Sequence, residues 1–189
     1  YALQPPAING DTNVCEGSAG NGYETAAGMN NYAWLVSAGG TITDGGGSTD
    51  DYVEITWEDT GAQTVSVSYT TPDNCISSTT NQDITVNSLP TVTCPNDSTV
   101  CVNDTPFALS GGSPAGGSFS GDGVSSDTFD PSAAGLGAHT ITYTYFDGDS
   151  CSNSCTYNIT VDPVPSVPDT AFTICSEYEL DINLNDIVP

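Results

Sequence analysis

Seven cysteines are the residues of this chain with the clearest capacity for chemistry. They are Cys15, Cys75, Cys94, Cys101, Cys151, Cys155 and Cys175. The spacings Cys94-x6-Cys101 and Cys151-x3-Cys155 fit no common zinc template, and the chain contains no C-x-x-C redox pair. A small chain this rich in cysteine is typical of an oxidising compartment, so we expect disulfides and an extracellular location at the cell surface.

Catalysis is not predicted. The single histidine, His139, begins a predicted strand, and no spacing places it beside a nucleophile and an orienting carboxylate, as a catalytic triad requires. Paired carboxylates such as Asp50-Asp51 could support glycoside hydrolysis only inside a cleft. We therefore expect a protein without enzymatic activity.

Carboxylates in turns have two competing roles. Asp147 and Asp149 flank Gly148, and Asp122 lies in the glycine-rich segment 111–124. Aspartates in such positions most often cap a turn by accepting backbone N–H groups. Their oxygens would also suit calcium, although the full ligand loop is missing. We expect turn capping, with structural calcium at Asp122, Asp147 and Asp149 as the alternative and no other cofactor.

The net charge excludes several classes of partner. The chain has 24 acidic residues, no Lys and no Arg, for a formal net charge of −24. Such a chain repels nucleic acid, and it contains no Lys–carboxylate or Arg–carboxylate ion pair. The acidity is best explained by solubility at high local concentration. No apolar run approaches the roughly 18 residues needed to span a bilayer, so we expect no membrane-spanning segment.

A repeated hairpin organises the chain. Side chains alternate along 137–145, which predicts a half-buried strand followed by a turn at 147–150. The same pattern occurs earlier, because Gly61, Val65, Tyr69 and Cys75 recur as Gly137, Ile141, Tyr145 and Cys151, each 76 positions later. Four matches in one register predict a tandem array of related modules.

The repeat favours one disulfide pattern. Cys15 and Cys75 are the only cysteines of the first module, so they most simply pair with each other. The match of Cys75 to Cys151, and of Cys15 to Cys101, transfers that bond to the second module. Four cysteines allow three connectivities, of which this is one. The predicted bonds are Cys15–Cys75, Cys101–Cys151 and Cys94–Cys155, with Cys175 left over for a partner further along the array.

The elements that carry these residues are short strands. Alternate positions of 31–36 place Tyr32, Trp34 and Val36 on one face. In the same way, Val53, Ile55 and Trp57 alternate with polar residues. About seven such strands in ~80 residues is the count of an immunoglobulin-like sandwich. We therefore predict an all-β fold of tandem immunoglobulin-like β-sandwich modules stapled by disulfides. The predicted parts are a linker from a preceding module at 1–6, a first sandwich at 7–88, a second with two disulfides at 89–163, and the start of a third module at 164–189.

Particular segments of the chain resemble a known family. The motifs are Tyr32-Ala-Trp34, Gly39-Gly-Thr-Ile42, Val53-Glu-Ile-Thr-Trp57, Gly61 and Val65-Ser-Val67, framed by Cys15 and Cys75. They resemble the PKD-like modules repeated in very long surface proteins of Bacteroidota. Segment 91–161 is similar to the disulfide-bearing immunoglobulin-like repeats of gliding-motility adhesins in the same bacteria. Asp97-Ser98-Thr99 and Asp169-Thr170-Ala171 resemble the O-glycosylation motif of this group, which implies glycans at Ser98 and Thr170.

The expected function is therefore structural and adhesive. The chain is predicted to be a module array in an extracellular stalk or filament, whose partners are further modules of the same chain or neighbouring copies, and surface glycans. The alternative is a carbohydrate-binding accessory module of a secreted hydrolase. Exposed coplanar aromatic rings would favour the alternative, whereas Trp34 and Trp57 alternate as core residues do.

Overall fold

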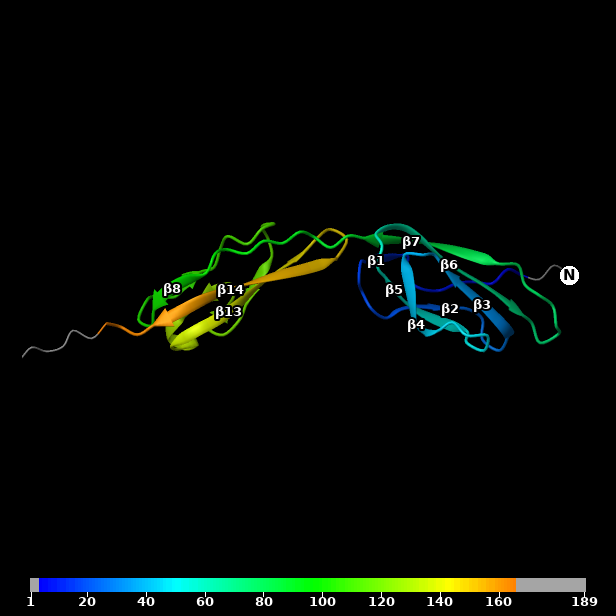
Figure 1. The fold of residues 1–189 in the computed structure, drawn as a ribbon, viewed down its shortest axis with the longest axis horizontal. Coiled ribbons are helices and arrows are strands. Elements are labelled where there is room, and N and C mark those ends of the chain that lie inside the picture. The colour runs from blue at the N-terminus through cyan, green and yellow to red at the C-terminus, as the bar shows by residue number, and fades with distance from the viewer. Residues whose placement is uncertain (1–3, 166–189) are drawn as a thin grey trace, which may run out of the picture.

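A computed structural model describes residues 4–165 of the chain. Its strands form two β-sandwich modules, and every strand pairing joins strands within 13–87 or within 98–162. The modules lie end to end and are joined by the segment 88–97 (Figure 1). The all-β fold of tandem immunoglobulin-like modules is confirmed.

The first module packs a four-stranded sheet against a three-stranded sheet. The larger has the order β1-β7-β6-β3 and the smaller the order β2-β5-β4. The bounds of the larger sheet are β1 Asn13–Cys15, β7 Thr80–Asn87, β6 Gly61–Thr70 and β3 Asn30–Val36. Those of the smaller sheet are β2 Asn21–Glu24, β5 Tyr52–Trp57 and β4 Gly40–Gly45. β1 pairs with β7 in parallel, and the neighbouring pairs are antiparallel.

Alternation along the strands builds the first core. Val53, Ile55 and Trp57 of β5 are fully buried, while the residues between them are partly accessible. Tyr23 packs edge-on against Trp57, and Trp57 Nε1 donates a hydrogen bond to the Tyr23 hydroxyl at 3.0 Å. Trp34 is also buried and donates to the Asp50 carbonyl at 3.0 Å. Both tryptophans are thus core residues.

The second module repeats the larger sheet with the same strand order. Read from the edge that holds the module's first strand, its order is β8-β14-β13-β10, which corresponds to β1-β7-β6-β3. The bounds are β8 Ser98–Cys101, β14 Ser152–Asp162, β13 Gly137–Phe146 and β10 Ser118–Ser120. The facing sheet has the order β11-β12-β9, with bounds β11 Val124–Ser125, β12 Thr128–Phe129 and β9 Phe107–Ala108. A short helix, α1 Pro131–Ala134, precedes β13. β8 pairs with β14 in parallel, as β1 does with β7.

The predicted hairpin is the centre of the second core. β13 pairs with β14 along its whole length, from Gly137 opposite Val161 to Phe146 opposite Ser152. Ile141 of β13 lies opposite Tyr157 and is fully buried. The core cluster contains Phe129, Ile141, Tyr157, Ile159 and Val161.

Two of the three predicted disulfides are wrong. The structure has Cys15–Cys151 and Cys94–Cys155, while Cys75 and Cys101 carry no disulfide. Cys15 lies opposite Asn87, at the far end of β7 from Cys75. The eight residues of β7 span roughly 25 Å at about 3.3 Å per residue, whereas disulfide-bonded Cα atoms lie within about 7 Å.

The same geometry separates Cys101 from Cys151. Cys101 lies opposite Asp162 at the end of β14, whereas Cys151 immediately precedes β14. Because the first strand of each module pairs in parallel with the last, its cysteine lies at the opposite end of the sheet from the hairpin cysteine. The Cys94–Cys155 bond has the predicted partners, with Cα atoms 5.7 Å apart.

Candidate functional site: the junction between the modules

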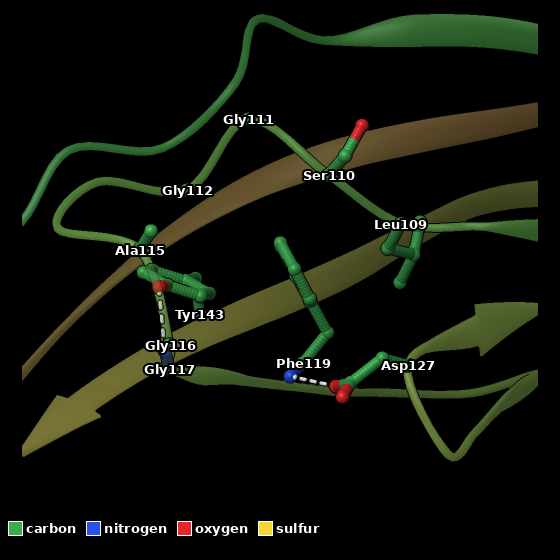
Figure 2. A pocket seen from close by; sticks show the side chains of 10 residues that line it. All are labelled: Leu109, Ser110, Gly111, Gly112, Ala115, Gly116, Gly117, Phe119, Asp127 and Tyr143. Atoms are coloured by element: carbon green, nitrogen blue, oxygen red, sulfur yellow. Dashed lines mark hydrogen bonds between the residues drawn. The ribbon is translucent and has the colours of Figure 1, made fainter.

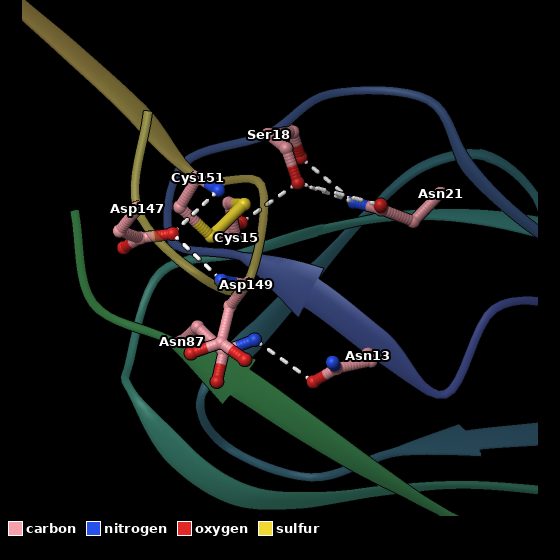
Figure 3. Close-up of a disulfide and its surroundings, with 8 residues drawn as sticks. All are labelled: Asn13, Cys15, Ser18, Asn21, Asn87, Asp147, Asp149 and Cys151. Atoms are coloured by element: carbon pink, nitrogen blue, oxygen red, sulfur yellow. Dashed lines mark hydrogen bonds between the residues drawn. A yellow bond between two sulfur atoms is a disulfide. The ribbon is translucent and has the colours of Figure 1, made fainter. Parts of the chain in front are cut away.

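The Cys15–Cys151 disulfide joins one module to the other. Cys15 is the last residue of β1, and Cys151 lies in the turn between β13 and β14 (Figure 3). Their Cα atoms are 5.6 Å apart, although 136 positions separate them in the sequence. Cys151 is fully buried and Cys15 is half-buried. The bond is therefore an inter-module crosslink.

A tight turn positions Cys15. Both the backbone N–H and the hydroxyl of Ser18 donate to the Cys15 carbonyl, at 3.1 and 2.7 Å. The Asn21 side-chain amide donates to the carbonyls of Ser18 at 2.7 Å and Ile55 at 2.9 Å. Glu16 N donates to the Asn87 carbonyl at 2.8 Å. These bonds attach the turn to strands of both sheets.

A capped hairpin turn positions Cys151. Asp147 N donates to the Cys151 carbonyl at 2.9 Å, and the Asp147 carboxylate accepts from Asp149 N at 3.0 Å and Cys151 N at 2.9 Å. Ser150 has a positive φ of 65°, which turns the chain sharply before Cys151. Asp147 therefore caps the turn, as an Asx residue is expected to do.

A groove of about 320 Å³ lies beside the disulfide. Both modules and the connecting segment line it. The lining residues are Cys15, Glu16, Gly17 and Ser18 of the first module, Leu89 of the connecting segment, and Ser150 and Ser152 of the second module. Across the same junction, the Asn153 side chain donates to the Pro90 carbonyl of the connecting segment at 3.0 Å. The junction is thus held by a covalent bond and a hydrogen bond.

The three calcium candidates do not form one site. Asp147 and Asp149 share a turn, whereas Asp122 lies between β10 and β11. Gly121, next to Asp122, lies against the Thr140 carbonyl of β13. Asp147 follows Thr140 by seven positions along this strand direction, so the two lie roughly 23 Å apart at about 3.3 Å per residue. Within residues 4–165, no group of three or more His, Cys, Asp or Glu side chains is placed to hold a metal ion. Calcium binding stays a prediction.

The other predicted residues lie apart from the junction. Ser98 is the exposed first residue of β8, an edge strand. Glycosylation at this serine stays a prediction, and Thr170 and Cys175 lie outside the described residues, as does most of the predicted third module at 164–189. His139 Nε2 donates to the Gly135 carbonyl at 2.9 Å, and its ring packs near Phe129. The imidazole thus secures the turn that follows α1.

A second groove, of about 270 Å³, lies under the glycine-rich loop of the second module (Figure 2). The Tyr143 hydroxyl donates to the Pro114 carbonyl and accepts from Gly117 N at 2.8 Å. A Cβ at Gly112 would lie 2.7 Å from the Tyr143 ring, so glycine is required for this close packing. Asp127, also in the lining, accepts from Phe119 N at 2.6 Å. The polar groups here hold the loop on the sheet.

Sequence reasoning found the cysteines of the junction but missed their partnership. It also missed Ser18, Asn21 and Asn153, which hold the turns and the connecting segment. The spacing of the cysteines carries no signal for this bond. Parallel pairing of the first and last strands places the two cysteines of one module at opposite ends, and that pairing is seen only in the structure.

A family model described as a PKD-like domain matches residues 1–87. The first module is thus similar to a PKD-like domain. The described strands of this PKD-like module, from β1 to β7, all fall inside the matched range. No curated protein matches the chain.

Several solved structures resemble the chain at low identity. Fibronectin(III)-like modules of CbhA from Clostridium thermocellum are 16% identical, with a TM-score of 0.39, covering 83% of this chain and 95% of theirs. The R347E mutant of the SrpA adhesin from Streptococcus sanguinis is 14% identical, with a TM-score of 0.35, covering 88% of this chain and 100% of its own. The D00-D0 domain of intimin is 13% identical, with a TM-score of 0.36, covering 83% and 99%. Likenesses this distant carry no functional argument. Across the described part of the chain, no helix is long and apolar enough to cross a membrane.

Proposed function

We propose that the chain is a structural and adhesive segment of an extracellular bacterial stalk or filament, with no catalytic role. The observation that carries this proposal is the Cys15–Cys151 bond. A protein that only presented binding sites would gain little from a covalent bond between modules. In a stalk, such a bond fixes the angle between modules and limits how far the chain extends under tension.

The position of the bond supports a mechanical role. Tension that enters before Cys15 and leaves after Cys151 passes directly through the two sulfur atoms. The residues between these cysteines include β2 to β7 of the PKD-like module and β8 to β13 of the second module. Most of both cores thus lies off the covalent route that carries the load.

An oxidising, extracellular location follows from the same bonds. Structural disulfides persist in secreted and surface proteins and are kept reduced in most cytosols. The net charge of −24 would also keep neighbouring filaments apart by repulsion, which suits a protein at high local density. The proposed partners are further modules of the same kind, in the same chain or in neighbouring copies, and surface glycans.

The carbohydrate-binding alternative has less support. Trp34 and Trp57 are both buried, and each indole N–H is satisfied within the core. Neither ring is available as a flat platform for a sugar. The described residues therefore favour the structural role.

Single-molecule stretching tests the proposal. The chain is pulled through its two ends, and the maximum extension is compared between the wild type and a Cys15→Ser/Cys151→Ser variant. In the variant, the load follows the backbone from residue 15 to Cys94 and then crosses the Cys94–Cys155 bond. We expect a gain of roughly 75 residues, or about 260 Å at about 3.5 Å per residue.

The matched control removes the other disulfide. A Cys94→Ser/Cys155→Ser variant loses a bond and some stability, but its load path through Cys15–Cys151 is unchanged. Its maximum extension should equal that of the wild type. An unchanged extension in the Cys15→Ser/Cys151→Ser variant would show that the inter-module bond carries no load and would refute the mechanical role.

A further inference from the structure

Cys75 and Cys101 repeat the environments of the two cysteines that form the junction. Neither carries a disulfide; Cys75 is exposed and Cys101 is half-buried. Cys75 is the hairpin cysteine of the PKD-like module, as Cys151 is of the second module. Cys101 ends β8, as Cys15 ends β1. Residues 4–165 therefore hold one bonded pair of this type, Cys15–Cys151, and one unbonded cysteine of each kind.

The turn at Cys75 has the same backbone structure as the turn at Cys151. Thr71 N donates to the Cys75 carbonyl at 2.8 Å, as Asp147 N donates to Cys151 at 2.9 Å. The Thr71 hydroxyl accepts from Cys75 N at 3.2 Å, in the place of the Asp147 carboxylate. Asn74 has a φ of 62°, matching the 65° of Ser150. Cys75 is thus presented by the same loop that presents Cys151 to its partner.

The strand end at Cys101 likewise matches that at Cys15. Asp104 N donates to the Cys101 carbonyl at 3.0 Å, as Ser18 N donates to Cys15 at 3.1 Å. Val102 N donates to the Asp162 carbonyl at 2.9 Å, as Glu16 N donates to Asn87 at 2.8 Å. The backbone beyond the first strand is therefore folded in the same way in both modules.

The surfaces beside these two cysteines carry exposed apolar side chains where the existing junction has its groove. Ile76 follows Cys75 and is 77% exposed; its counterpart Ser152 lines the groove. Val164 lies two residues after Asp162 and is 49% exposed, matching Leu89, which lies two residues after Asn87 and lines the same groove. An equivalent junction would bring these two side chains to one groove.

The two unbonded cysteines lie at opposite ends of the two-module rod. The β6–β7 turn, which contains Cys75, lies at the end of the PKD-like module away from the second module (Figure 1). The end of β8, at Cys101, lies at the far end of the second module. The two cysteines are thus too far apart to bond within one molecule.

We infer that Cys101 bonds to the hairpin cysteine of a following module of the same kind, and Cys75 to the strand-end cysteine of a preceding one, so that successive modules are crosslinked head to tail. This inference rests on the proposed array. Each bond forms by thiol–disulfide exchange with an oxidant that carries a disulfide, either a small molecule such as oxidised glutathione or an enzyme. Two cysteine thiols lose their protons and two electrons, one disulfide forms, and the oxidant is reduced to two thiols.

Complementary variants of the full chain test the inference, with each copy supplying one end. Cys175→Ser is introduced throughout, so that residue 175 cannot contribute a thiol. One variant adds Cys75→Ser and keeps Cys101; the other adds Cys101→Ser and keeps Cys75. Both are mixed at about 1 mM, the effective concentration of a neighbouring module on a short linker, in a glutathione redox buffer with about 1 M salt to screen the repulsion between acidic copies.

The expected result is a disulfide dimer in the mixture, at least tenfold above the level in either variant alone. Peptides cut with pepsin, followed by mass spectrometry, should show Cys101 joined to Cys75. Equal amounts of dimer in the mixture and in the separate variants would overturn the inference. So would a statistical mixture of Cys75–Cys75, Cys101–Cys101 and Cys75–Cys101 bonds, because random oxidation does not require docking.

A surface variant separates docking from thiol reactivity. Ile76→Asp in the copy that supplies Cys75 should lower the dimer yield several-fold, because the charge would enter the groove of the new junction. Leu35→Asp is the matched control, since Leu35 is 66% exposed on β3, away from both ends. Equal effects of the two would contradict the docking. Loss of this dimer leaves the stretching result at Cys15–Cys151 unaffected, so the two proposals fail separately.

Discussion

Among residues 4–165, the hydrogen bond to the Tyr23 hydroxyl is the only one that the Trp57 indole makes. Trp57 is fully buried, so its N–H cannot turn to water if the acceptor is lost. Tyr23→Phe should therefore lower the free energy of unfolding by about 1–3 kcal/mol, the cost of a buried unsatisfied donor. Urea denaturation followed by tryptophan fluorescence measures this change.

The matched control for that substitution is Tyr52→Phe. The Tyr52 hydroxyl donates to Asp44 at 3.2 Å on the exposed side of the PKD-like module, where water can replace the bond. Its unfolding free energy should stay within about 0.5 kcal/mol of the wild type. Equal losses in the two variants would show that the Tyr23 hydroxyl has no special role.

Alkaline pH should unfold the modules through their buried tyrosines. Burial raises the pKa of Tyr157, and burial, followed by the charge of Asp11, raises the pKa of Tyr23 above its ordinary 10.0 even though the hydrogen bond from Trp57 acts to lower it. A raised pKa favours the neutral form in the folded state. The resulting stability is complete below the unfolded pKa near 10.0 and is lost as the pH rises through the folded pKa values.

Absorbance at 295 nm, which reports tyrosinate, tests this expectation. The ionisation of Tyr23 and Tyr157 should coincide with the loss of near-ultraviolet circular dichroism. In Tyr157→Phe, the late part of the absorbance change should shrink by one tyrosine. Smooth titration of all tyrosines near pH 10, with the fold intact, would contradict the assignment.

At the scale of elements, the glycine-rich loop of the second module depends on close approach to β13. A Cβ at Gly117 would lie 2.4 Å from the Thr144 carbonyl oxygen and 2.5 Å from the Tyr143 ring. Gly117→Ala must displace the loop or the ring, so we expect a loss of about 1–3 kcal/mol of stability from overpacking. Thermal unfolding followed by far-ultraviolet circular dichroism measures it.

Gly148→Ala is the control for that loop. Gly148 lies in the β13–β14 turn, and nothing is within 4 Å of an added Cβ there. Its melting temperature should match that of the wild type to within about 2 °C. If Gly117→Ala were equally silent, the loop would be free to move away from Tyr143 and the packing argument would fail.

At the scale of the whole molecule, repulsion between carboxylates opposes folding. The chain has a net charge of −24 and no Lys or Arg to offset it. Because salt screens exposed charges, raising sodium chloride from about 0.02 M to 0.5 M should increase the urea midpoint. A midpoint that is independent of salt would show that the carboxylates are too far apart to matter.

The same composition determines how proteases act on the chain. Trypsin cleaves after Lys and Arg, and the chain has neither. We expect the protein to remain uncut by trypsin even when it is reduced and unfolded in urea. Pepsin, which does not need basic residues, should digest the reduced, unfolded chain and is the positive control. Tryptic fragments from a sample of verified sequence would contradict the expectation.

Local patterns in the sequence determined the fold class and much of each sheet. The alternation of Val53, Ile55 and Trp57 predicted a half-buried strand, and β5 buries those three residues. The matched hairpins at 61–86 and 137–161 predicted the repeat, and the structure gives both modules the same four-strand order. These features are local because strand alternation and turn chemistry depend on neighbouring residues.

Only the tertiary structure decided which cysteines meet. The repeat shows that Cys15 matches Cys101 and that Cys75 matches Cys151, but equivalence between modules does not say which module supplies each partner. Parallel pairing of β1 with β7 places Cys15 at the end of the PKD-like module that faces the second one, and the β13–β14 turn brings Cys151 to it. That contact depends on how a whole sheet is oriented and on how one module follows the next, and neither is encoded in the spacing of the cysteines.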